Sequence, residues 1–238
     1  MRTLAIFSVL ALAAVSNATV VWSNIDNKPA DLMNTADGWT ASRANDPDFV
    51  SYRCAADDFI LTETTRLTKL TYYSVPISNP EILGGDWYIF NGDNPGGPPG
   101  EVFTGAFSQP LDRADTGWFN AAFGENVWSN SLSMDLVLGP GHYFIGFRTL
   151  QTFSNGGGKN GILTTRTAKG TARAQWNFEI MEDGSAFGPW VTMDVFNGVQ
   201  DQEWAFEMEG EIVPEPATLA LMGLGFGGLA LARRRKTK

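Results

Sequence analysis

Residues Trp128–Leu138 read WSNSLSMDLVL, and this stretch alternates apolar with polar side chains. The apolar side chains of one parity are Trp128, Leu132, Met134, Leu136 and Leu138. The polar side chains of the other parity are Ser129, Ser131, Ser133 and Asp135. A period of two predicts a β-strand with one face on a hydrophobic core and the other in water.

The same period recurs in other parts of the chain. His142–Arg148 and Gln175–Met181 each place three apolar side chains on one face. Shorter apolar runs predict five further strands: Phe59–Leu61, Leu67–Val75, Trp87–Phe90, Val102–Phe107 and Trp190–Phe196. Helical periodicity is hard to find, so the pattern favours an all-β protein.

The last predicted strand is Glu203–Ile212. We expect Trp204, Phe206 and Met208 to face the core. The opposite parity carries four glutamates: Glu203, Glu207, Glu209 and Glu211. A row of outward charges is typical of an edge strand that must not pair with another chain, and we interpret the row in this way.

Turn-forming residues separate the predicted strands. They occur at Asn91-Gly92, Pro95–Gly100, Gly139–Gly141, Asn155–Gly158, Asp183-Gly184 and Asn197-Gly198. Many short strands between such turns predict an antiparallel β-sandwich, and we assign it to one domain, Thr19–Val213. A chain of this length can bury a sizeable core.

The first eighteen residues, Met1–Ala18, have the layout of a secretion signal. Arg2 precedes the apolar run Leu4–Val15, and small residues stand at Ser16 and Ala18. This order predicts passage through the Sec translocon and cleavage by signal peptidase, with a mature chain that begins at Thr19. A retained membrane anchor is the alternative.

The C-terminus, VPEPATLALMGLGFGGLALARRRKTK, combines three features in a fixed order. Pro214-Glu215-Pro216 is followed by the uncharged segment Ala217–Ala232 and by a basic tail, residues 233–238. As a helix the apolar segment would span about 24 Å, slightly less than a hydrocarbon core of about 30 Å. We expect a transmembrane helix, with Arg233, Arg234, Arg235 and Lys236 as a cytoplasmic anchor.

These features resemble the PEP-CTERM sorting signal of bacterial surface proteins. The resemblance implies recognition by an exosortase, which is a membrane-embedded cysteine protease. It also implies export across the inner membrane, transient anchoring by the C-terminal helix, and transfer to the cell surface or an exopolysaccharide matrix. An ordinary C-terminal anchor with chance prolines is the alternative.

The domain itself resembles a β-sandwich module found with PEP-CTERM tails. The similar pieces are Ala55–Phe59, Trp87–Gly100, Leu136–Phe147 and Asp201–Gly210. The resemblance implies a jelly-roll-like fold and carries no assigned activity.

Charge and composition exclude several classes of function. Residues 19–213 hold 11 Lys and Arg against 25 Asp and Glu, which gives a net charge of −14. Such a surface repels nucleic acid, so we expect no nucleic-acid partner. Cys54 is the only cysteine and His142 the only histidine. An internal disulfide and a zinc site built on Cys and His are therefore excluded. A Cys54–His142 thiol dyad is one hypothesis, and a small buried cysteine near a strand is the alternative.

Two short groups of oxygen-bearing residues could bind Ca²⁺. Asp57 and Asp58 precede a predicted strand, and Asn91, Asp93 and Asn94 lie in a Gly-rich loop. Carboxylate and amide oxygens suit a hard cation. Acids and amides also favour turns without any metal, so we expect no obligatory cofactor.

An enzymatic function and a sugar-binding function are two further hypotheses. A glycoside hydrolase needs two facing carboxyls, for which the candidates are Glu179, Glu182, Asp183, Asp201 and Glu203. Four tryptophans near loops or strand ends could stack on sugar rings: Trp39, Trp87, Trp118 and Trp190. We expect a non-catalytic, exported surface or matrix protein that associates with exopolysaccharide. The alternative is a secreted polysaccharide hydrolase or a carbohydrate-binding module.

Overall fold

A computed structural model describes ten stretches of the chain. They are residues 18–35, 38–40, 42–46, 49–77, 80–92, 102–152, 159–165, 175–177, 190–192 and 202–214. The predicted signal peptide, except its last residue, and the predicted apolar segment and basic tail lie outside these stretches. Within them, the single helical turn α1 (Ala30–Asn34) is the one helix, and no helix is long and apolar enough to cross a membrane.

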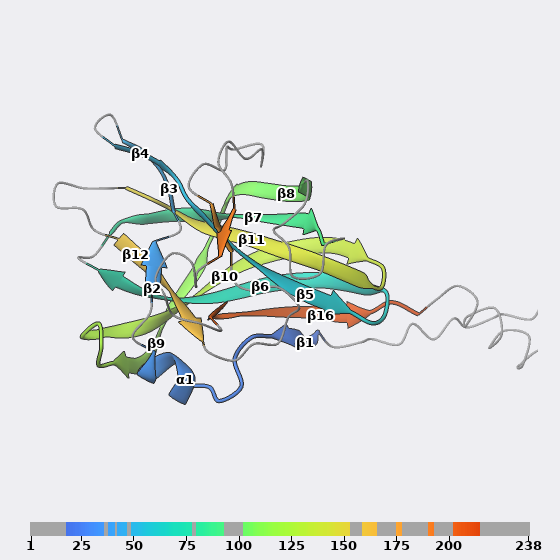
Figure 1. Ribbon diagram of the computed structural model, residues 1–238, viewed down its shortest axis with the longest axis horizontal. Coiled ribbons are helices and arrows are strands. Elements are labelled where there is room, and N and C mark those ends of the chain that lie inside the picture. The colour runs from blue at the N-terminus through green and yellow to red at the C-terminus, as the bar shows by residue number, and fades with distance from the viewer. Residues whose placement is uncertain are drawn as a thin grey trace, which may run out of the picture.

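The strands form two sheets that pack face to face (Figure 1). The first sheet runs β1 (Thr19–Ser23), β16 (Phe206–Ile212), β6 (Thr65–Ile77), β10 (Glu125–Leu138) and β9 (Asp112–Asn120). Beside this path, β12 (Lys159–Thr165) pairs with β6, with β2 (Gly38–Thr40) and with β15 (Glu203–Trp204). All of these pairings are antiparallel.

The second sheet has β11 (Gly141–Gln151) at its centre. Its path is β14 (Val191–Thr192), β13 (Gln175–Asn177), β5 (Cys54–Leu61), β11, β3 (Ser42–Asp46) and β4 (Phe49–Tyr52). β7 (Ile82–Asn91) pairs with β11 and with β8 (Val102–Gln109). Every pairing is antiparallel except the short parallel contact between β11 and β3. The predicted antiparallel, jelly-roll-like β-sandwich is confirmed.

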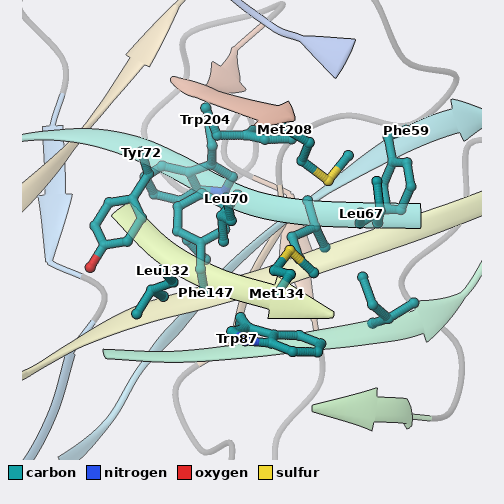
Figure 2. Packing of buried hydrophobic residues seen from close by; sticks show 14 of the residues in the cluster. Phe59, Leu67, Leu70, Tyr72, Trp87, Leu132, Met134, Phe147, Trp204 and Met208 are labelled. Atoms are coloured by element: carbon teal, nitrogen blue, oxygen red, sulfur yellow. The ribbon is translucent and has the colours of Figure 1, made fainter. Parts of the chain in front are cut away.

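The core fills the space between the sheets (Figure 2). Leu132, Met134 and Leu138 of β10 are buried, as the alternation predicts. Across the interface, the ring of Tyr72 on β6 stacks on that of Phe147 on β11 with centroids 5.0 Å apart. Such aromatic pairs add to the free energy gained by burying apolar surface.

The last part of the chain agrees with the prediction in its apolar residues and differs in its acidic ones. Trp204, Phe206 and Met208 are fully buried. Glu203, predicted to face water, is only 1% exposed. Ala205 has the same parity as Glu203 and is also buried, so this part of the chain is covered on both faces and not on one.

The edge-strand interpretation of the glutamate row is wrong. β16 lies between β1 and β6 in the sheet. Two of its glutamates form ion pairs of 2.6 Å, Glu207 with Lys28 and Glu209 with Lys69. The charges therefore cover the outer face of an interior strand.

The two ends of the described domain lie side by side. Thr19, the first residue of β1, is the register partner of Gly210 near the end of β16. The next residue after β16, Val213, donates its backbone N–H to Thr64 O over 2.8 Å. Both targeting segments predicted from the sequence therefore leave the sandwich from the same end.

Candidate functional site

The most concentrated group of ionisable side chains in the described part of the chain is an acidic cluster of Asp57, Asp58 and Glu203. One carboxylate oxygen from each lies within 4.8 Å of the others, and all three residues are buried. Asp57 and Asp58 lie inside β5 rather than before a strand, so the predicted turn at this position is wrong. Glu203 reaches the cluster from β15.

The carboxylate of Asp57 accepts three hydrogen bonds from nitrogen donors. Its Oδ2 accepts from Asn24 Nδ2 at 3.0 Å and from the backbone N–H of Trp204 at 2.7 Å. Its Oδ1 accepts from the backbone N–H of Asp58 at 3.0 Å. Asp57 thereby joins β5 to the segment after β1 and to β15, and these bonds compensate part of its desolvation.

Asp57 also shares a hydrogen bond with Glu203. Burial raises the pKa of Asp57 to about 7, and the Asp58 carboxyl adds to the rise. The hydrogen bonds from Glu203 and from the backbone of Trp204 and Asp58 act in the opposite direction.

His142 of β11 lies between two acceptors. Its Nε2 is 2.7 Å from Oδ2 of Asp58, and its Nδ1 contacts the carbonyl oxygen of Gly92. The ring of Phe144 packs edge-on against the imidazole, with centroids 5.4 Å apart. The only histidine of the chain therefore anchors β11 to both β5 and the end of β7, a role that the sequence did not suggest.

The two predicted Ca²⁺ groups are in different surroundings. Asn91 is exposed at the end of β7, while Asp93 and Asn94 lie outside the described residues. The acidic cluster has the ligand types that Ca²⁺ prefers. However, a cation at Asp57 would face the three N–H groups that already point at this carboxylate, so its binding there would require those bonds to break.

The proposed Cys54–His142 dyad does not form. His142 is the register partner of Ile60, and Cys54 lies six residues before Ile60, at the start of β5. The Cys54 thiol is fully buried, and burial raises its pKa to about 12. A thiol in this environment is not a nucleophile at neutral pH.

Among the candidate hydrolase carboxyls, Glu203 belongs to the described residues. Glu179, Glu182, Asp183 and Asp201 lie outside the described residues. Glu203 is in the acidic cluster, where it hydrogen-bonds with Asp57.

Of the tryptophans proposed for glycan stacking, Trp87, Trp118 and Trp190 pack in three different clusters and do not share one surface. Trp87 is 6% exposed and packs in the intersheet core, which corrects its predicted place at a strand end (Figure 2). Trp118 is half-buried and stacks on Tyr73 at 6.3 Å. Trp190 is half-buried against the edge of Phe90 at 5.4 Å. The backbone of Trp39 lies in β2.

Other aromatic side chains are more exposed than these tryptophans. Phe103 and Phe107 of β8 are 56% and 39% exposed, and Phe119 of β9 is 52% exposed. The ring of Tyr88 on β7 lies 5.7 Å from that of Phe107. The sequence offered no signal for these phenylalanines, because β8 was predicted only as a short strand and β9 was not predicted.

Comparison with protein families decides the nature of the C-terminus. Residues 213–236 match the family described as the PEP-CTERM protein-sorting motif. The chain carries a PEP-CTERM sorting signal. A comparison with curated proteins found no match for the chain.

The PEP-CTERM match includes the predicted motif Pro214-Glu215-Pro216 and the basic residues Arg233–Lys236. A PEP-CTERM signal is processed by an exosortase and implies export and membrane anchoring through the C-terminus. The match begins at Val213, directly after β16 ends at Ile212. The sorting signal is therefore joined to the sandwich without a spacer.

Proposed function

We propose that the chain is a non-catalytic protein of the cell surface or extracellular matrix, and that it associates with exopolysaccharide. The observation that carries the proposal is the PEP-CTERM match at residues 213–236, which directly follows the last strand of a β-sandwich. The Sec translocon and signal peptidase would act on Met1–Ala18, and an exosortase on the C-terminal signal. The mature protein would then consist mainly of the sandwich.

The surroundings of the acidic cluster support a structural role for it. Asp57 receives N–H donors from three places in the chain, and Asp58 is held by His142. A hydrolytic carboxyl pair has to face its substrate, whereas these side chains are buried between strands. We therefore favour a surface or matrix protein that binds exopolysaccharide over a protein that hydrolyses it.

The sorting half of the proposal is tested by intact-mass measurement of the exported protein. We expect a chain that begins at Thr19 and has lost the basic tail. A variant with Pro214, Glu215 and Pro216 all changed to Ala should keep Arg233–Lys236 and stay in the membrane fraction, while Thr237→Ala should be processed normally. Extracellular wild-type protein that still carries Arg233–Lys236 would contradict C-terminal processing.

The exopolysaccharide half is tested by glycan-array binding of the exported protein. The exposed phenylalanines of β8 are the first residues to change, because aromatic faces stack on sugar rings. We expect Phe103→Ala/Phe107→Ala to weaken binding, and Val137→Ala, a substitution of a side chain that is 54% exposed on β10, to leave it unchanged. Cleavage of a bound polysaccharide would instead favour the hydrolase alternative.

A further inference from the structure

One end of the intersheet space is lined by polar side chains. We call this group the polar layer: Tyr72, Ser74, Arg113, Asn130, Thr149 and Asn160. Figure 2 shows the hydroxyl of Tyr72 pointing away from the neighbouring apolar side chains of the core. That hydroxyl lies 3.0 Å from Oγ1 of Thr149, which also accepts a hydrogen bond from Asn160 Nδ2 at 3.0 Å. The polar layer thus connects β6, β11 and β12.

Asn130 has a fixed amide orientation. Its Nδ2 donates to Ser74 Oγ at 2.8 Å and contacts the carbonyl oxygens of Tyr72 and Trp128 at 3.3 Å. These three acceptors fix the nitrogen, and therefore also the oxygen, of the side chain. Asn130 is fully buried, and its Oδ1 has no hydrogen-bond partner within the described structure.

Arg113 on β9 is the register partner of Asn130 on β10. Its guanidinium carbon lies 4.1 Å from the centroid of the Trp128 ring. Its Nε and Nη2 are buried and, among the residues described, have no acceptor. Nε and Nη2 of Arg113, two donors without an acceptor, therefore belong to the residue paired with Asn130, whose Oδ1 is an acceptor without a donor.

We propose that Arg113 and Asn130 bind a hydroxyl group between them. A hydroxyl oxygen accepts from the N–H groups of Arg113, and its hydrogen donates to Oδ1 of Asn130, so one group would satisfy both side chains. A buried polar atom without a partner costs free energy, which gives such a group a reason to bind. Anions without a proton would satisfy Arg113 but repel the Asn130 oxygen.

The hydroxyl group has two sources, water and a saccharide. An internal water molecule bridges polar groups in many protein interiors. A sugar hydroxyl offers the same donor and acceptor, and Trp128 beside the site is only half-buried. This inference does not depend on the sorting signal, because it rests on Arg113, Asn130 and their surroundings alone.

Two crystal structures of the exported protein distinguish the sources, one without saccharide and one with glucose. We expect an oxygen atom within about 3.2 Å of both Asn130 Oδ1 and a nitrogen of Arg113. The same isolated oxygen in both crystals identifies water, whereas a hexose hydroxyl in the second identifies a saccharide site. A direct Arg113–Asn130 hydrogen bond, or no oxygen in either crystal, would overturn the proposal.

Substitution of Arg113 tests whether the guanidinium is a ligand of the oxygen. Arg113→Met removes the donors and keeps an apolar chain beside Trp128, so the oxygen should be lost or weakly occupied. If Arg113→Met does not fold, Arg113→Leu provides the same test, because it also removes the donors. Asn126→Ala is the control, because Asn126 lies on β10 as Asn130 does, but bonds to Asp115 at 2.9 Å instead. An oxygen that keeps full occupancy without Arg113 would overturn the assignment.

Discussion

Arg148 donates a hydrogen bond from Nε to Oδ2 of Asp86 over 2.7 Å, and both side chains are 0% exposed. Nη2 of Arg148 also donates to the hydroxyl of Tyr88 at 2.6 Å, and the backbone N–H of Ser108 donates to Oδ1 of Asp86 at 2.7 Å. This buried ion pair joins β11, β7 and β8, so three strands of the second sheet depend on it.

We expect Asp86→Ala to lower the free energy of unfolding by about 3–5 kcal/mol, because the guanidinium would be left buried without its counter-charge. Asp86→Asn keeps a hydrogen-bond acceptor for Arg148, so it should lower the free energy of unfolding by less. The control is Asp135→Ala, which breaks the Arg66–Asp135 pair of 2.8 Å. Asp135 has a side chain that is 74% exposed, so this change should cost under about 1 kcal/mol. Urea denaturation measures the free energy of unfolding of all three variants. Equal decreases for Asp86→Ala and Asp135→Ala would contradict the prediction.

The acidic cluster should make stability fall as pH rises. Burial raises the pKa of Asp57 from 3.8 to about 7. Below a pH of 3.8, Asp57 is protonated in both the folded and the unfolded chain. Between the two values only the folded chain holds this proton, so unfolding releases a proton and stability decreases with pH, by at most about 1.4 kcal/mol per pH unit. Above about pH 7 this contribution is constant.

Melting temperatures measured from pH 4 to pH 8 test this dependence. Asp57→Asn removes the ionisation, so the loss of stability toward neutral pH should be smaller than in the wild-type protein. Asp135→Asn, at an exposed position, should leave the slope unchanged. An identical slope in Asp57→Asn and wild type would show that Asp57 does not titrate in this range.

Sequence periodicity predicted the fold well where a strand has one apolar face. In β10 the alternation placed Leu132, Met134 and Leu138 correctly in the core. β9 was missed because its sequence, DRADTGWFN, has no regular alternation and contains Gly117 at a φ of 72°. A turn-forming glycine inside a strand hides the period of two.

The candidate site was harder to predict than the fold. Asp57 and Asp58 read as a turn because adjacent acids are usually solvated. Their burial depends on Asn24 and Glu203, which lie 33 and 146 positions away from Asp57 in the sequence. The strand of Asp57, β5, does not pair with the segments that carry these two residues. Contacts of this range are set by the packing of the sheets, and periodicity within one strand carries no information about them.

Substitution by alanine should affect stability differently at Gly146 in β11 and at Gly139 just before this strand. At Gly146 of β11 an added Cβ would lie 2.6 Å from the ring of Phe90 and 3.3 Å from Sγ of Cys54. At Gly139 no atom lies within 4 Å. We expect Gly146→Ala to lower the unfolding free energy by about 1–3 kcal/mol through overpacking, and Gly139→Ala to change it little. Thermal denaturation compares them, and a stable Gly146→Ala variant would mean that Phe90 moves aside freely.

Cys54 should be unreactive in the folded protein. Its thiol is fully buried with a pKa raised to about 12, so neither access nor the thiolate form favours alkylation. We expect iodoacetamide to modify Cys54 slowly in native buffer and rapidly in guanidinium chloride, as measured by intact mass. Rapid native modification would contradict the burial of this strand.

The pairing of Thr19 with Gly210 has a mechanical consequence. A load applied at Val213 pulls β16 along its own axis, and the ladders to β1 and β6 on its two sides resist that pull together. Hydrogen bonds loaded in shear must break as a group, whereas bonds at a peeled edge break one after another. A strand between two neighbours, immediately before the sorting signal, is therefore suited to resist a pull at its C-terminal end.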